Sequence, residues 1–176
     1  MLNKNVQSAL NEQIKNEVFS AYLYLSMSGY FEAANLPGFA RWIRVQYEEE
    51  LEHALKFFDF VHDRGGRVTL HAVDQPPSDF HSPLDVFQRA LAHEQKVTGM
   101  INNLYALAVQ ENDYPAQVLL QWFVSEQVEE EKNATNIVEQ LKLVGDNGSA
   151  LLILDRELGA RKGGGTKESS QGAAPT

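Results

Sequence analysis

The sequence contains no cysteine among its 176 residues. This absence excludes disulfide bonds, thiolate nucleophiles, iron–sulfur clusters and metal sites of the Cys-x-x-Cys type. Long apolar runs are missing as well, since no stretch approaches the roughly 18 apolar residues of a membrane-spanning helix. The polar segment MLNKNVQSALNEQ at the start also lacks the apolar core of a signal peptide. We therefore expect a cytoplasmic protein with no membrane partner.

Basic residues are outnumbered, with 15 Lys and Arg against 24 Asp and Glu and a net charge of −9. Such a charge disfavours nucleic acid and anionic surfaces as partners, and it attracts cations. An acidic balance is also common in proteins that are merely soluble, so the positions of the acids are more informative than their number. With 43% hydrophobic residues, the chain can form one domain whose core needs no disulfide.

Glycine and proline occur in clusters, which divide the sequence into helical segments. Apolar residues recur three and four positions apart in four long segments, so we expect helices over residues 6–34, 38–64, 83–112 and 114–144. Ser82 and Pro83 are typical of an N-cap and the first residue of a helix. A short fifth helix is predicted over residues 149–158, with Ser149 as its N-cap.

The connection between the second and third segments is long and covers residues 65–82. A helix of about 27 residues is about 40 Å long, whereas this connection can extend over about 60 Å. It can therefore run the length of a bundle, so that helices two and three are parallel and the other consecutive pairs are antiparallel. The predicted fold is all-α: a four-helix bundle with one long crossover between helices two and three, plus a short fifth C-terminal helix.

Each of the four long segments carries a carboxylate on its apolar face. The residues concerned are Glu17, Glu50 together with His53, Glu94, and Glu130. At a rise of about 1.5 Å per residue, Glu50 and Glu94 lie about 17 Å from the same end, and Glu130 is level with Glu94. Glu17 fits less closely, within one or two turns of Glu50. We expect the four carboxylates to meet near the middle of the bundle.

A single glutamate on an apolar face usually reaches solvent with its charged end. A single histidine there is more often hydrogen-bonded than bound to a metal. Four carboxylates at one depth are different, because they would repel one another and lose much of their hydration. No lysine or arginine lies on the same faces, so a multivalent cation explains the pattern best. Carboxylates with one imidazole favour Fe, Mn or Zn, and four carboxylates can neutralise two divalent ions.

Four segments around these residues match a known family: NEQIKNEVFSAYLY, YEEELEHALKFFDF, AHEQKVTG and QWFVSEQVEEEK. Over residues 1–160 the sequence resembles the non-haem ferritins of bacteria and archaea, with the segments in the family's order and spacing. Residues 161–176 lie outside the resemblance, and their low-complexity, glycine-rich composition predicts a disordered tail.

The resemblance implies a pair of iron ions. Their ligands would be Glu17, Glu50 and His53 for one ion and Glu50 as the bridge, Glu94 and Glu130 for the other, with Gln127 nearby. It also implies a third iron site toward a cavity, formed by Glu49, Glu126 and Glu129. A solvated acidic face is the alternative reading of these three residues. Tyr24 resembles the family's site tyrosine, which hydrogen-bonds near the metal and is a candidate electron donor, and a plain buried tyrosine is the alternative.

Some positions depart from related families. Gln127 and Glu130 stand where bacterioferritins have a second Glu-x-x-His motif, and Leu51 stands at their haem-binding methionine. No haem is therefore expected. DNA-protecting mini-ferritins place their ligands between subunits and lack a fifth helix, whereas this chain has a complete ligand set and the segment LLILDREL.

The activity implied by the resemblance is that of a ferroxidase. Fe(II) would be oxidised by dioxygen or hydrogen peroxide, and Fe(III) would be stored as mineral inside a homo-oligomeric cage of twenty-four subunits. The apolar fifth helix would either contact other subunits or pack on the end of its own bundle. Three alternatives remain: a di-iron oxidase or peroxidase without storage, a storage subunit without catalysis, and a helical signalling or binding protein.

Overall fold

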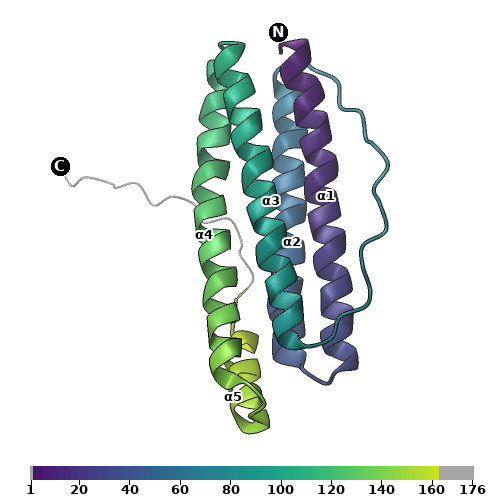
Figure 1. Ribbon diagram of the computed structural model, residues 1–176. Coiled ribbons are helices and arrows are strands. Elements are labelled where there is room, and N and C mark those ends of the chain that lie inside the picture. Colours follow the sequence, from purple (N-terminus) through teal and green to yellow (C-terminus); the bar gives the residue numbers. More distant parts are fainter. Residues whose placement is uncertain (1, 163–176) are drawn as a thin grey trace, which may run out of the picture.

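The computed structural model describes residues 2–162, which form five α-helices and no strand (Figure 1). The helices are α1 (Lys4–Ala33), α2 (Pro37–Asp63), α3 (Pro83–Gln110), α4 (Tyr114–Val144) and α5 (Gly148–Gly159). The predicted fold class is confirmed. None of the helices in this part of the chain combines the length and apolar character needed to cross a membrane. Of the predicted disordered tail, residues 163–176 lie outside the described residues.

The helix starts follow the capping rules of the sequence. Ser82 accepts a hydrogen bond from the Asp85 backbone N–H at 3.1 Å, which confirms the predicted N-cap of α3. The predicted cap of α5 was wrong, because Asn147 rather than Ser149 accepts from the Ala150 N–H, at 3.1 Å. Asparagine and serine cap helices about equally well, so the sequence alone did not separate the two positions.

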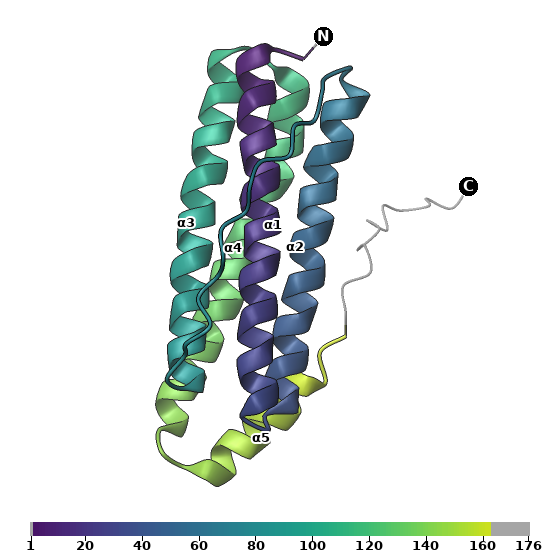
Figure 2. The same cartoon turned by 90° about the vertical axis from the view of Figure 1, so that its right-hand side faces the viewer.

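The long crossover runs along the outside of the bundle, as Figure 2 shows. It lies over α1, where the Asn11 amide donates to the Arg67 carbonyl oxygen at 3.2 Å and the Ser26 hydroxyl donates to the Pro77 carbonyl oxygen at 2.6 Å. Helices α2 and α3 are consequently parallel, as the length of the connection predicted. This parallel arrangement brings Glu50 and Glu94 to the same level.

The apolar core is divided into two clusters. One contains Phe31, Phe39 and Phe87 at the end of the bundle near α5, and the other contains Phe57 and Phe123 toward the opposite end. Along every long helix, the carboxylate on the apolar face lies between the residues of these two clusters. The polar middle of the bundle is thereby closed to water from both ends.

Helix α5 packs against the start of α2. The Phe39 N–H donates to the Asp155 carboxylate at 2.9 Å, and a Cβ atom on Gly38 would lie 1.7 Å from the Asp155 carbonyl oxygen. Leu154 is buried in this contact, whereas Leu152 and Ile153 on the same helix are exposed. The helix therefore packs on its own bundle and still presents an apolar surface outward.

We expect Gly38→Ala to displace α5, because the added methyl group collides with backbone that has little freedom to move. The expected cost is about 1–3 kcal/mol of unfolding free energy, measured by denaturant titration of the apoprotein. Gly99→Ala is the matched control, since nothing lies within 4 Å of a Cβ at that exposed helical position. Its expected effect is a gain of about 0.5–1 kcal/mol from helix propensity. Equal stabilities of the two variants would contradict the close contact.

Candidate metal centre

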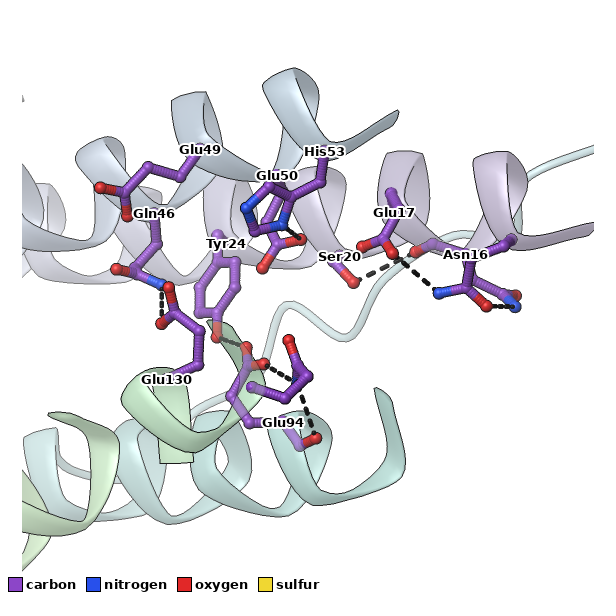
Figure 3. Close-up of polar contacts among 12 residues, drawn as sticks. Asn16, Glu17, Ser20, Tyr24, Gln46, Glu49, Glu50, His53, Glu94 and Glu130 are labelled. Atoms are coloured by element: carbon purple, nitrogen blue, oxygen red, sulfur yellow. Dashed lines mark hydrogen bonds and ion pairs between the residues drawn. The ribbon is translucent and has the colours of Figure 1, made fainter. Parts of the chain in front are cut away.

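Five predicted ligands meet at mid-bundle, and all are buried (Figure 3). They come from all four long helices: Glu17 from α1, Glu50 and His53 from α2, Glu94 from α3 and Glu130 from α4. No member of this set is more than 5% exposed, so no carboxylate reaches solvent with its charged end. Burial of so many acids is costly without a positive charge among them.

Glu17, Glu50 and His53 each place one ligand atom within 4.8 Å of those of the other two. Glu17, whose depth fitted least well from the sequence, therefore lies beside the α2 pair. Within the described chain, the buried Oε2 atoms of Glu17 and Glu50 have no hydrogen-bond partner. Two unsatisfied carboxylate oxygens beside an imidazole nitrogen form a donor set that suits a divalent iron ion.

Glu94 and Glu130 face the same space but are held by hydrogen-bond donors. The Tyr24 hydroxyl donates to Oε1 of Glu94, and the Gln127 amide donates to Oε2 at 3.1 Å. Gln46 donates to Oε2 of Glu130 at 2.7 Å. Over residues 2–162, neither carboxylate joins the three-residue cluster around Glu50. The ligands predicted for the second ion, Glu50, Glu94 and Glu130, therefore lie at one level, but their oxygen atoms do not converge on one position.

Three buried glutamines each donate a hydrogen bond to one of the glutamates. Besides the contacts of Gln127 and Gln46, Gln13 donates to Oε1 of Glu17 at 2.8 Å. An amide fixes a carboxylate in position but leaves its negative charge uncompensated. No role for Gln13 or Gln46 was predicted from the sequence. The i,i+4 spacing of Gln13 and Glu17 was the one available signal for the first of them.

The carboxyl groups have raised pKa values. Burial, followed by the charge of Glu50, raises the pKa of Glu17 well above its usual range. Burial, followed by the charges of Glu94 and Glu130, does the same for Glu50. Burial raises the pKa of Glu94, and burial with Glu94 and Glu49 raises that of Glu130 from 4.5 to about 7. The raised pKa values favour the protonated carboxyl groups, and a metal ion would displace these protons.

His93 lies next to this centre and was not predicted. Its Nε2 is 2.8 Å from Oγ of Ser20, whose hydroxyl donates to the Asn16 carbonyl oxygen, so the imidazole N–H donates to Ser20. Burial, followed by the charge of Lys96, lowers the pKa of His93 to about 4. The ring is therefore neutral at pH 7 and supplies no counter-charge to Glu94.

The predicted third ligand group lies outside the mid-bundle cluster. Glu49 is half-buried and points to the Gln46 side of α2 (Figure 3), Glu126 is half-buried, and Glu129 is exposed. Burial raises the pKa of Glu49, and the charge of Glu126 acts in the same direction. Glu49 forms an ion pair with Arg161, whose Nη2 lies 2.7 Å from Oε2. Arg161 belongs to the segment that the sequence assigned to the tail.

Comparison with known proteins gives one consistent result. The Ferritin family model, a ferritin-like domain, matches residues 7–144. A bacterial non-heme ferritin of Bacteroides fragilis is 40% identical over 161 residues, which cover 92% of this chain and 100% of that protein. A bacterial non-heme ferritin of Staphylococcus aureus is 39% identical, covering 92% and 97%. An open pore ferritin from Archaeoglobus fulgidus is 51% identical with a TM-score of 0.90, covering 92% of this chain and 99% of that structure.

Proposed function

The chain belongs to the ferritin family, as a prokaryotic-type non-haem member, and on this basis we propose that it is a ferroxidase that also stores iron. Its substrate is Fe(II), and its oxidant is dioxygen or hydrogen peroxide. The observation that carries the proposal is the burial of Glu17, Glu50, Glu94 and Glu130 at one level with an imidazole (Figure 3). Within residues 2–162, no lysine or arginine is buried among them.

Glu50 has the central role in the proposed reaction. It lies within the cluster of Glu17 and His53, and Glu94 and Glu130 are near enough for their charges to act on it. These contacts support a role as the bridge between two Fe(II) ions, of which one would be held with Glu17 and His53 and the other with Glu94 and Glu130. Each Fe(II) gives up one electron, and dioxygen takes the two electrons with two protons to form hydrogen peroxide. The carboxyl groups release protons as the ions bind.

Aromatic rings hold the imidazole in place. His53 lies edge-on to Trp122 at 5.4 Å and to Phe123 at 5.6 Å between ring centroids. These contacts restrict the ring to an orientation in which Nδ1 lies 3.5 Å from Oε2 of Glu50. A ligand whose position is fixed before the metal arrives loses less entropy on binding.

Storage requires an enclosed space, and we propose a homo-oligomeric cage of twenty-four subunits. The exposed Leu152 and Ile153 of α5 support an assembly, because they form apolar surface next to the bundle end. Oxidised iron would leave the centre through a third iron site at Glu49, Glu126 and Glu129 and then mineralise inside.

Particle mass and iron retention test the proposal together. Twenty-four chains of 19.7 kDa give a particle of about 470 kDa by light scattering. Aerobic addition of Fe(II) should produce ferric absorbance, and iron far in excess of the paired sites should elute with the particle. A small species that oxidises iron and retains none would instead identify an oxidase without storage. A large particle that takes up iron only as fast as iron oxidises in buffer would identify a storage subunit without catalysis.

Tyr24→Phe is expected to slow the oxidation about tenfold while two ions per subunit still bind. The hydroxyl is one of two donors to the Glu94 carboxylate, and one such hydrogen bond contributes about 1.5 kcal/mol. Initial rates of ferric absorbance and anaerobic Fe(II) titration separate rate from binding. Tyr22→Phe, at an exposed position of the same helix, is the control. A wild-type rate in Tyr24→Phe would mean that Tyr24 is a buried core residue with no role in the oxidation.

A further inference from the structure

Arg161 connects the end of α5 to α2 beside the metal centre. Its Nη2 donates to Oε2 of Glu49 at 2.7 Å, and its Nη1 donates to Oε1 of Gln46. The guanidinium also lies 4.5 Å from the ring centroid of Trp42. Contacts to three successive turns of one helix fix a side chain that is otherwise flexible.

The position of Arg161 depends on how α5 is docked. Its backbone N–H donates to the Leu158 carbonyl oxygen at 3.1 Å, which places it directly after the helix end. Gly159 packs closely on Gly38, with only 3.0 Å between a Cβ at Gly159 and Cα of Gly38. The packing of α5 on α2 therefore determines where the guanidinium lies along α2.

Gln46 links this guanidinium to the centre. Its amide oxygen accepts from Arg161, and its amide nitrogen donates to Glu130 at 2.7 Å. Because each end of the amide has a different partner, Gln46 can adopt only one of its two orientations. The hydrogen bond from Arg161 to Gln46 thus determines that Glu130 receives a donor.

A hollow of about 200 Å³ borders the guanidinium, lined by Trp42, Asn133, Asn136, Ile137, Leu158 and Arg161. This hollow gives the side chain room to move off Glu49 without unfolding α5.

We propose that Arg161 acts as an internal cation: its guanidinium pairs with Glu49 where a metal ion would otherwise bind. The guanidinium must therefore move away before an ion can bind to Glu49. The inference rests on the proposed function, because it concerns a third ion next to the paired site. It assigns Arg161 a positioning role: the first two ions bind with the guanidinium in place, and the third displaces it. The residue thereby delays transfer of iron out of the centre until the paired site is filled.

Titration of the assembled apoprotein with Zn²⁺ tests this role, since Zn²⁺ is redox-inert. Wild type should bind two ions tightly and a third weakly. Arg161→Gln should bind the third ion about tenfold more tightly, because loss of a charged hydrogen bond frees Glu49. Arg161→Lys keeps the charge and should lie between the two, whereas Arg156→Gln, exposed on the same helix, should match wild type. Equal or weaker affinity for the third ion in Arg161→Gln would overturn the proposal.

A spectroscopic readout covers the case in which Arg161→Gln fails to assemble. The chain has two tryptophans, so the emission of Trp42 is obtained by comparing the protein with its Trp42→Phe variant. Departure of the guanidinium from this ring should change the emission at the third equivalent of Zn²⁺, and Glu49→Gln should abolish that change. A change at the first two equivalents, or none at all, would contradict the proposal. Failure of the proposed function would be seen separately, because the protein would then lack two tightly bound ions whose binding depends on Glu50.

Discussion

Glu50→Ala is expected to reduce the initial rate of Fe(II) oxidation about 100-fold or more. This side chain is the one that faces both proposed metal positions, through the cluster with Glu17 and His53 and through its electrostatic contact with Glu94 and Glu130. Its removal would take a ligand from both proposed ions at once. The measurement is the initial increase of ferric absorbance after aerobic Fe(II) addition, with particle mass recorded on the same samples.

Glu50→Gln separates charge from volume. The amide fills the same space, cannot bridge two cations, and relieves repulsion with the neighbouring carboxylates. We expect a rate close to that of Glu50→Ala and an apoprotein at least as stable as wild type. Glu52→Ala, exposed two residues further along α2, should retain the wild-type rate. Equal initial rates in wild type and Glu50→Ala would rule out this centre as the site of oxidation.

The sequence predicted those parts of the centre that depend on helix register. Apolar periodicity and the length of the 65–82 connection placed Glu50, Glu94 and Glu130 at one depth, and a parallel α2 and α3 realise that arrangement. Glu17 lies closer to Glu50 than its residue count indicated. Counting residues from helix ends neglects the tilt between helices, which shifts a side chain by about a turn.

Side-chain hydrogen bonds were not predictable in the same way. Gln46 is a neutral residue on an apolar face, and nothing in its spacing shows that it meets Glu130 of another helix. Gln13 differs, because it lies four positions before the Glu17 to which it donates. Arg161 was missed for a different reason: its contact with Glu49 exists only because α5 turns back onto the start of α2. Such a contact is tertiary, and the low-complexity residues that follow led to Arg161 being included in the predicted tail.

The pH dependence of apoprotein stability is the second large expected effect. A carboxyl group whose folded pKa is raised stabilises the fold below its unfolded pKa, and this contribution is lost as the pH rises through the folded pKa. For Glu130 that window runs from 4.5 to about 7. The loss amounts to about 3 kcal/mol for this group alone. Glu17 and Glu50 act in the same direction, because burial raises the pKa of each well above its ordinary value.

Glu130→Gln separates the contribution of Glu130 to the pH dependence from the contributions of groups that act in the opposite direction. His93, whose pKa is lowered to about 4, stabilises the fold as the pH rises from 4 toward its ordinary 6.5, and it acts equally in both proteins. The difference in unfolding free energy between variant and wild-type apoprotein should therefore shift by about 3 kcal/mol in favour of the variant between pH 4.5 and 8. Denaturant titrations at a series of pH values measure it. A difference that does not change with pH would show that Glu130 ionises as freely as in the unfolded chain.

Metal loading should reverse the trend in wild type. Bound Zn²⁺ or anaerobic Fe(II) stabilises the ionised carboxylates, so the affinity rises with pH as fewer protons must be displaced. We expect the melting temperature of the metal-loaded protein to be constant or to rise from pH 6.5 to 8, while that of the apoprotein falls. Removal of the metal by a chelator should restore the falling curve. Parallel curves for the loaded and metal-free protein would mean that the ions bind at the exposed acidic surface, because only buried carboxylates couple metal binding to stability in this way.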